Sequence, residues 1–325
     1  MAAVLTSSVA RISKAQERFS SLIRRRVAPR LAELEAFRER QRQRFLAILL
    51  ADAAGIVVVL PLLWRLDLGY AVLAAFGLGA LGLFLLQHTQ RVFVRRVRET
   101  VMPAVCEAIG DLRSMTGMAP GLDFEGLESF GLLPRHNRKA VDDVFVGRHR
   151  DTDFTMAEVR LSYRSAGRRR STRTKFRGLI LAIATPREVG ARILIARDTG
   201  LFGNRLKGWF KTFSGLQRLA LPHPAFEARF EVFSDHPGRA LETITPSFCD
   251  SLAALADAHQ GAPLQGAFLG ERFYLAMPRR GDQFAIGSLF RPLDRLEDDA
   301  ARLLHDVQIV HRVIDCLHGE RPQDL

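Results

Sequence analysis

A dense block of apolar residues near the N-terminus is the most informative pattern in the chain. Residues Phe45 to Trp64 form a run of about 20 residues whose only charge is Asp52, and Tyr70 to Gln87 form an uncharged run of about 18. Each run is long enough to cross the hydrocarbon core of a membrane as a helix. The connection between them is so short that the two helices must be antiparallel neighbours. The pattern therefore predicts a two-helix transmembrane hairpin over residues 45–87.

Arginine residues beside the hairpin predict its orientation. Several lie on each flank, whereas the connecting turn holds Arg65 alone. Because the loops on the cytoplasmic side of a membrane carry the excess of positive charge, we expect both termini in the cytoplasm. The flanking residues are Arg38, Arg40, Arg42, Arg44, Arg91, Arg95, Arg96 and Arg98.

Two features inside the hairpin bear on its packing. Ala71, Ala75 and Gly79 recur at four-residue spacing and give a smooth face, which fits either the first span or a second copy of the chain. Asp52 is costly in an apolar span, so we expect it to pair with a flanking arginine or to lie near water.

The segments on either side of the hairpin are predicted to be helical. Residues 1–44 form a basic amphipathic arm that we expect to break at Pro29, and it fits either an anionic lipid surface or a partner helix. Residues 88–121 comprise a juxtamembrane helix, expected to run through Met115, and a linker.

Residues 122–325 have the pattern of a separate α+β domain. Helices are expected after Thr245-Pro246 and over Leu293–Leu317. Without regular βαβ alternation, the sheet is expected to be mostly antiparallel with packed helices. The predicted strands are Thr152–Tyr163 with a bulge, Phe176–Thr185, Ala191–Arg197, Phe226–Ser234, and a hairpin over Leu264–Met277 that turns at Gly270-Glu271.

Composition narrows the chemistry that the chain can perform. A net charge of +12 and a pI near 10.6 favour anionic partners. The three cysteines are far apart and indicate neither a disulfide framework nor a zinc site. Asp153 and Arg177 are expected to pair across adjacent strands. Without a recognised motif, we predict no catalytic residue, no metal site and no cofactor, and enzymatic activity is not favoured.

Two basic segments are the candidate binding surfaces. Residues 164–175 carry cations and no acid, and they are predicted to contact an anionic surface or to form a solvated loop. Residues 201–221 pair an apolar stripe with cations, which is typical of an interfacial helix or of a helix that covers a sheet. The candidate residues are Arg168, Arg169, Arg170, Arg173 and Lys175 in the first segment, and Phe202, Leu206, Lys207, Trp209, Phe210, Lys211 and Phe213 in the second.

Short motifs in this domain resemble one known family. In order and spacing they are similar to a bacterial membrane-associated family, domain of unknown function 3137, over roughly Met102 to Leu293. Members place two transmembrane segments before the domain, which implies the same architecture here. The family implies no activity. The motifs are Gly131-Leu132-Leu133-Pro134-Arg135, Gly147-Arg148, Thr152-Asp153-Phe154, Glu158-Val159, Phe176-Arg177-Gly178-Leu179, Phe226-Glu227, residues 230–235, and Ala240-Leu241 before Thr245-Pro246.

The expected protein is a two-pass protein of the bacterial inner membrane. Its hairpin anchors a cytoplasmic interaction module that binds a protein partner, a further copy of itself or an anionic lipid surface. The alternatives are a membrane-associated enzyme without a recognisable motif and a sensor of nucleic acid or of a small molecule. Nucleic acid is disfavoured because the basic loop lacks interleaved aromatic residues.

Overall fold

The structure is a computed structural model that describes residues 2–64, 68–115, 117–165, 171–197, 215–258, 263–279, 289–290, 293 and 296–319. The chain divides into two compact units. The helical unit comprises Ile12–Ala108 and Ala285–Ala301, and the sheet unit comprises Ile109–Phe284 with Met1–Arg11 and Arg302–Leu325.

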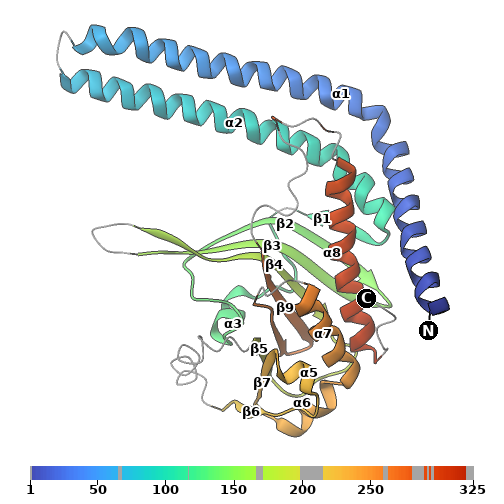
Figure 1. Ribbon diagram of the computed structural model, residues 1–325. Coiled ribbons are helices and arrows are strands. Elements are labelled where there is room, and N and C mark those ends of the chain that lie inside the picture. The colour runs from blue at the N-terminus through green and yellow to red at the C-terminus, as the bar shows by residue number, and fades with distance from the viewer. Residues whose placement is uncertain are drawn as a thin grey trace. The chain divides into compact units, whose positions relative to one another are not determined.

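Two long antiparallel helices form most of the helical unit (Figure 1). Helix α1 runs over Ala2–Trp64 and α2 over Leu68–Ile109. The predicted break at Pro29 is wrong, because α1 continues through it; a proline removes one backbone hydrogen bond, which a long helix tolerates. The predicted helix end at Met115 is also wrong, since Gly110 adopts a positive φ of 110° directly after α2.

The face of α1 that packs inside the helical unit repeats at alternating spacings of four and three residues. Such a repeat keeps a single stripe directed toward a neighbouring helix. The stripe comprises Leu34, Arg38, Gln41, Phe45, Ile48, Asp52 and Gly55, of which the first three are buried and the others half-buried. On the facing stripe of α2, Ala71, Gly82, Thr89 and Phe93 are buried. Phe37 and Phe93 stack with their ring centroids 6.3 Å apart, which joins the two helices.

The sheet unit contains nine strands, and every pairing between them is antiparallel. The spatial order is β1-β2-β3-β4-β9-β8-β5-β7-β6. The strands are β1 Leu112–Met115, β2 Arg138–His149, β3 Thr152–Arg164, β4 Thr172–Ala184, β5 Ile193–Arg197, β6 Gln217–Leu219, β7 Phe230–Ser234, β8 Gln265–Leu269 and β9 Arg272–Pro278.

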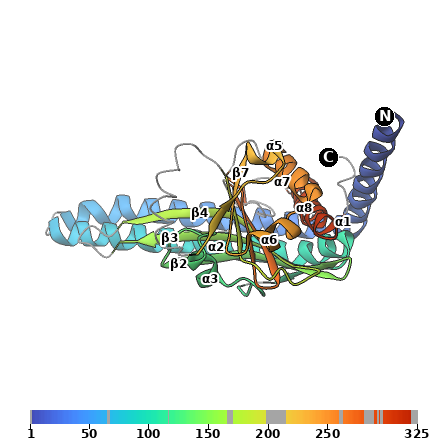
Figure 2. The same ribbon diagram turned by 90° about the horizontal axis from the view of Figure 1, so that it is seen from below.

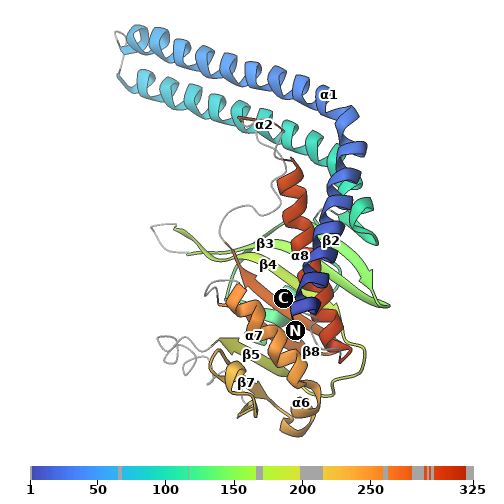
Figure 3. The ribbon, with the colours of Figure 1, turned by 45° about the vertical axis from the view of Figure 1, so that its right-hand side comes forward.

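Helices cover both faces of this sheet (Figure 2). The register places Val144, Ala157, Ile180 and Ala276 in one row across four strands, and Phe124 and Leu127 of α3 (Phe124–Ser129) belong to the same core. The row on the other face contains Phe154, Ile183 and Phe273. Helices α7 (Pro246–Ala258) and α8 (Leu296–Leu317) lie on that face, as Figure 3 also shows, with α5 (Pro224–Glu227) and α6 (Pro237–Thr243) near the β7 end.

The structure confirms the coarse fold expected from the sequence, which is an α+β arrangement of N-terminal helices and an antiparallel sheet. The tight turn at Gly270-Glu271 and the cap at Thr245 are also confirmed; the hydroxyl of Thr245 accepts a hydrogen bond from the backbone N–H of Phe248 at 3.3 Å. The strand expected over Phe226–Ser234 begins instead at Phe230. His223 caps a short helix before it by accepting a hydrogen bond from the Phe226 N–H at 3.2 Å.

Candidate functional site

An exposed apolar surface on the α1/α2 hairpin is the most unusual feature of the described residues. All but four of the exposed large apolar side chains lie between Leu46 and Val92. Phe76 is 78% exposed and Leu73 and Val57 are each 70% exposed, whereas a soluble domain buries such side chains. The surface comprises Leu46, Leu49, Leu50, Val57, Val58, Tyr70, Val72, Leu73, Phe76, Leu81, Leu83, Phe84, Leu85 and Val92.

One helical segment among the described residues, Gly69–Glu107, is long and apolar enough to cross a membrane. Only 11% of its most apolar stretch is buried, which distinguishes it from the core helix of a soluble protein. The expected first span, Phe45–Trp64, includes side chains that lie outside the described residues. The two-span hairpin therefore stays a prediction.

Asp52 lies in the stripe of α1 that faces α2. A Cβ atom added to Gly82 would lie 2.5 Å from Cγ of Asp52, so the carboxylate occupies the space left by the glycine. At Gly79, by contrast, an added Cβ atom would meet nothing within 4 Å. Gly82 is the position at which α2 accommodates the Asp52 side chain of α1; of the predicted small-residue face, Ala71 is buried and Gly79 leaves open space.

A short segment near residue 290 packs on the arginine-bearing part of α1. The Arg38 side chain is 9% exposed; it donates a hydrogen bond to the Leu289 carbonyl at 3.1 Å and pairs with Glu35 at 2.6 Å. The hydrogen bond to Glu35 raises the pKa of Arg38, and this effect is larger than the opposite effect of burial, which lowers the pKa. Phe45 and Phe290 meet edge to face at 4.9 Å. Leu289, Phe290 and Leu293, whose backbone N–H donates to Glu35 at 3.4 Å, thus form a strap that fixes the chain to α1 just before α8 begins.

The basic ribbon is the projecting end of the β3–β4 hairpin, defined here by Tyr163, Arg164, Thr172, Arg173 and Lys175 (Figure 1). Tyr163 lies opposite Arg173 and is 37% exposed, and Arg173 and Lys175 are exposed. The ribbon closes where the Ser165 backbone N–H donates to the Ser171 carbonyl at 3.0 Å. Its strands carry no acid between Ser162 and Arg177.

The other predicted site residues are not placed by the structure. Arg168, Arg169 and Arg170 lie outside the described residues, as does the proposed interfacial helix with Phe202, Leu206, Lys207, Trp209, Phe210, Lys211 and Phe213. Of the basic loop, the structure therefore brings together only Arg173 and Lys175, on one strand.

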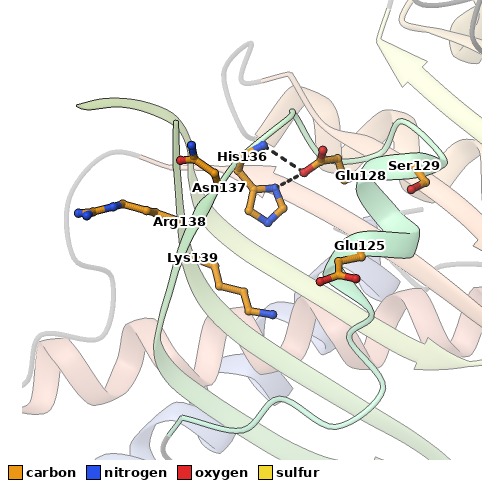
Figure 4. A pocket seen from close by; sticks show the side chains of 7 residues that line it. All are labelled: Glu125, Glu128, Ser129, His136, Asn137, Arg138 and Lys139. Carbon is orange, nitrogen blue, oxygen red and sulfur yellow. Dashed lines mark hydrogen bonds and ion pairs between the residues drawn. The ribbon is translucent and has the colours of Figure 1, made fainter. Parts of the chain in front are cut away.

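A hollow of about 320 Å³ lies between α3 and the start of β2 (Figure 4). Oε2 of Glu128 accepts the His136 backbone N–H at 3.0 Å and lies 2.7 Å from His136 Nδ1. The Pro134 carbonyl also lies 3.1 Å from Nδ1, so this geometry favours the tautomer with the proton there. Nζ of Lys139 sits 5.0 Å from the Phe124 ring centroid. Charges of both signs line the hollow, which suits a small polar molecule.

A histidine cluster joins the β2–β3 turn to the last turns of α8. The rings of His149 and His311 stack at 4.0 Å and 7°, and His149 Nε2 lies 2.9 Å from Oδ1 of Asp315. Arg150 pairs with the same oxygen at 2.8 Å. Burial, aided by the nearby His149, lowers the pKa of His311 to about 4. The His311 imidazole is therefore neutral at neutral pH.

Two ion pairs of the sheet unit contain a buried carboxylate. The two terminal nitrogens of the Arg279 guanidinium contact the Asp306 carboxylate, Nη1 at 3.0 Å and Nη2 at 2.6 Å. The Asp306 side chain is 3% exposed. Glu158, 1% exposed, lies 3.7 Å from Arg177. The predicted pair of Asp153 with Arg177 is wrong, because the register sets Arg177 opposite Arg160, and Asp153 instead pairs with Arg148 at 2.9 Å.

Metal and thiol chemistry have little geometric support in the part of the chain that the structure describes. No group of three or more His, Cys, Asp or Glu side chains there could hold a metal ion. Cys106, Cys249 and Cys316 are free and buried. Burial, with smaller effects of Asp250 and Glu227, raises the pKa of Cys249 to about 12, so its thiol is not a ready nucleophile.

The fold and the exposed apolar surface define the class of the protein: a hairpin of two long helices with exposed apolar side chains, joined in one chain to an antiparallel α+β domain. Residues 174–318 match the model of a family described as protein of unknown function (DUF3137). The expected resemblance is thereby confirmed from near the start of β4 to the end of α8. The match begins after the hairpin, so it does not test the two transmembrane segments.

Comparisons with individual proteins add little. No curated protein matches the sequence. The crystal structure of the mycobacterial trehalose monomycolate transport factor A, TtfA, is similar at 10% sequence identity over 68% of this chain and 95% of that chain, with a TM-score of 0.34.

Sequence reasoning missed the strap, the histidine cluster and the hollow. Arg38 and Leu289 are separated by 251 residues, and His149 and Asp315 by 166, so no local pattern joins them. One local signal existed. His311, Asp315 and His318 are spaced four and three residues apart, which places them on one face of a helix.

Proposed function

We propose that the chain is a two-pass protein of the bacterial inner membrane whose hairpin anchors a cytoplasmic interaction module. The observation that carries this proposal is the concentration of exposed large apolar side chains on both helices, where all but four of those among the described residues lie between Leu46 and Val92. Twenty residues of helix span about 30 Å, which matches the hydrocarbon core of a bilayer. Burial in lipid removes this surface from water.

The distribution of exposed cations supports an orientation with both termini in the cytoplasm. Arg40, Arg42 and Arg44 are exposed directly before the apolar part of α1, and Arg91, Arg95 and Arg96 are exposed where the apolar part of α2 ends. These arginines come from adjacent, antiparallel parts of the hairpin and so belong to one side of the membrane. Positive charge favours the cytoplasmic side.

The basic ribbon supports an anionic surface as one partner of the module. Each arginine or lysine near an anionic lipid surface contributes roughly 1 kcal/mol, and a tethered domain meets that surface at high local concentration. Tyr163, beside Arg173, is a side chain suited to the headgroup region. A protein with an acidic face could bind the same cations. The second experiment below distinguishes an anionic lipid surface from such a protein.

The anchor is tested by extracting membranes that contain the full chain with alkaline carbonate. We expect the chain to remain with the membrane pellet. A matched variant that replaces Leu73, Phe76, Leu83 and Phe84 with serine should move to the supernatant. The orientation is tested with Tyr70→Cys, at the turn of the hairpin. A thiol reagent that enters the periplasm but not the cytoplasm should label it. Release of the unaltered chain, or labelling of Tyr70→Cys only from the cytoplasm, overturns the two-pass anchor.

The ribbon is tested with a fluorophore on Thr172→Cys in the full chain, reconstituted in nanodiscs. Quenching by a headgroup-attached nitroxide should occur with phosphatidylglycerol and fall in neutral lipid, in high salt, or when Arg164, Arg173 and Lys175 become serine. A fluorophore on Thr243→Cys, at the end of α6, is the control for general proximity. Equal quenching in neutral and anionic discs excludes lipid as the ligand and leaves an acidic protein.

A further inference from the structure

One half of strand β2 has an open edge. Strand β1 pairs with β2 only from Val144 to Gly147, although β2 begins at Arg138. Along Arg138–Val141, no described residue pairs with β2 on the side away from β3. Arg138, Lys139 and Ala140 are exposed. An edge of this kind presents backbone donors and acceptors to a further strand.

The charges along this edge limit which strand fits it. Arg138 and Lys139 lie at one end, and Asp142 lies at the other. Because side chains alternate along a strand, Arg138, Ala140 and Asp142 share one face. The contact between Arg160, which lies opposite Ala140, and Asp142 at 3.7 Å agrees with this placement. An antiparallel partner therefore needs an acid opposite Arg138 and a base opposite Asp142.

The segment itself, read in the reverse direction, has this pattern. We propose that the β2 edge binds a second copy of this chain, with Ala140 opposite the second copy's Ala140 in an antiparallel pair. Arg138 then lies opposite the second copy's Asp142, and the symmetric ion pair forms on the other side of the two-fold axis. The small side chain of Ala140 occupies the axis, where the two strands approach most closely.

The same charges select this register over its neighbours. A shift of the symmetry axis from Ala140 to Lys139 would place the two Lys139 side chains opposite one another, and like charges in opposite positions destabilise a strand pair. A shift of the axis to Val141 would place Asp142 opposite Ala140 and remove its ion pair with Arg138, and it would extend the new pair further into the register irregularity between Val141 and Val144. Only the register centred on Ala140 forms both ion pairs.

Five residues of strand make a small interface, so the pairing rests on the proposed membrane anchoring for its strength. Anchoring confines both copies to one surface and raises their effective concentration. The cations at the edge also oppose pairing with strands that lack acids, which accounts for specificity toward the chain's own sequence.

The test is oxidative crosslinking of Ala140→Cys in the full chain, carried out in membranes. The native cysteines are buried, so a disulfide-linked dimer reports on the introduced thiol. Side chains directly opposite one another in a strand pair lie within reach of a disulfide. Thr174→Cys on β4 and Gln217→Cys on the distant edge strand β6, both at exposed positions, are the matched controls.

We expect a dimer with Ala140→Cys and much less with either control. Arg138→Asp or Asp142→Arg alone should lower the dimer fraction about fivefold, since each replaces two attractive pairs with two repulsive ones, and the two together should restore it. Equal crosslinking at all three positions, no rescue by the double variant, or an adduct with a different protein overturns the proposal. Carbonate extraction of the same samples distinguishes failure of the strand pairing from failure of the membrane anchor. If the chain stays in the membrane but forms no dimer, the pairing alone is refuted. If the chain is released, the anchor is refuted.

Discussion

The carboxylate of Asp52 on α1 occupies the space that a side chain would fill at Gly82 on α2. An added Cβ atom at Gly82 would lie 2.5 Å from Asp52 Cγ and 2.8 Å from Oδ1, closer than such contacts allow. The acidic side chain is thus turned toward the neighbouring helix. Asp52 is half-buried, and its placement gives Gly82 a role that Gly77 and Gly79 lack, because a Cβ atom added at either of those glycines would meet nothing within 4 Å.

Substitution of Gly82 with alanine should destabilise the hairpin, because the new methyl group forces Asp52 or the helix to move. Overpacking of this kind costs about 1–3 kcal/mol. Gly79→Ala is the matched control, since its added methyl group meets nothing within 4 Å, and it should be neutral or slightly stabilising. Thermal denaturation of the purified full chain in mild detergent gives the difference.

Asp52→Ala in the Gly82→Ala background tests the cause of that loss. Removal of the carboxylate vacates the space, so the double variant should recover most of the stability lost by Gly82→Ala. If Gly82→Ala and Gly79→Ala lower the denaturation temperature equally, the loss arises from helix backbone effects and the contact with Asp52 is unimportant.

The buried thiols should be inert in the folded chain. Burial raises the pKa of Cys249 to about 12 and, in spite of a hydrogen bond with the Ser251 hydroxyl, also raises the pKa of Cys316. A maleimide should therefore label the native chain slowly at neutral pH and all three thiols after denaturation, as read by mass spectrometry. Thr172→Cys, exposed on the basic ribbon, is the control that must react at once. Rapid labelling of native Cys249 would contradict its burial on the inner face of α7.

How much of the fold the sequence predicts depends on how regular each pattern is. The hairpin between β8 and β9 was predicted at its correct turn because its two strands alternate cleanly around Gly270. Strand β2 was missed because its register with β3 shifts between Val141 and Val144, and the shift reverses the alternation halfway along the strand. Asp142 and Asp143 stand at that point and lower the apparent strand propensity further.

The candidate site was harder to predict, for a different physical reason. Charge runs and apolar runs are properties of adjacent residues, so the apolar surface and the cations of the basic ribbon are visible in the sequence. The strap contact of Arg38 and the histidine cluster each depend on segments more than 150 residues apart. The error for Asp153 and Arg177 has a different origin: the alternation within each strand does not fix how the two strands are aligned, and the actual register sets Arg177 opposite Arg160.

Replacement of Asp306 alone should destabilise the sheet unit strongly. Asp306→Ala leaves the 16%-exposed Arg279 guanidinium without its carboxylate, and a buried charge deprived of its partner costs about 3–5 kcal/mol. Replacing both residues, with Arg279→Met and Asp306→Leu, should restore stability close to that of the unaltered chain. Chemical denaturation in mild detergent measures the free energies of unfolding.

The exposed pair of Arg148 and Asp153 provides the control for the buried one. These side chains are 58% and 65% exposed, so Asp153→Ala should change the free energy of unfolding far less than Asp306→Ala does. Similar losses for Asp306→Ala and Asp153→Ala would contradict the distinction between the two pairs that burial predicts.

The stability of the folded chain should depend on pH through His311. The pKa of this imidazole is about 4 in the fold and 6.5 in a solvated chain, so the folded state binds fewer protons between these values. The free energy of unfolding is therefore intact above pH 6.5 and falls as the pH falls toward 4. A shift of this size corresponds to a loss on the order of 3 kcal/mol at pH 4 and below.

Comparison with His311→Phe isolates this contribution, because a phenyl ring retains the packing against Phe154 but cannot be protonated. The groups around it are His149, Arg150 and Asp315, and all three remain in the variant. Denaturation curves from pH 7.5 to pH 4 should show a steeper loss for the unaltered chain than for His311→Phe. His236→Asn, at a histidine whose side chain makes no cap hydrogen bond, should retain the steep dependence. If His311→Phe loses stability with the same slope as the unaltered chain, proton uptake at His311 does not weaken the fold.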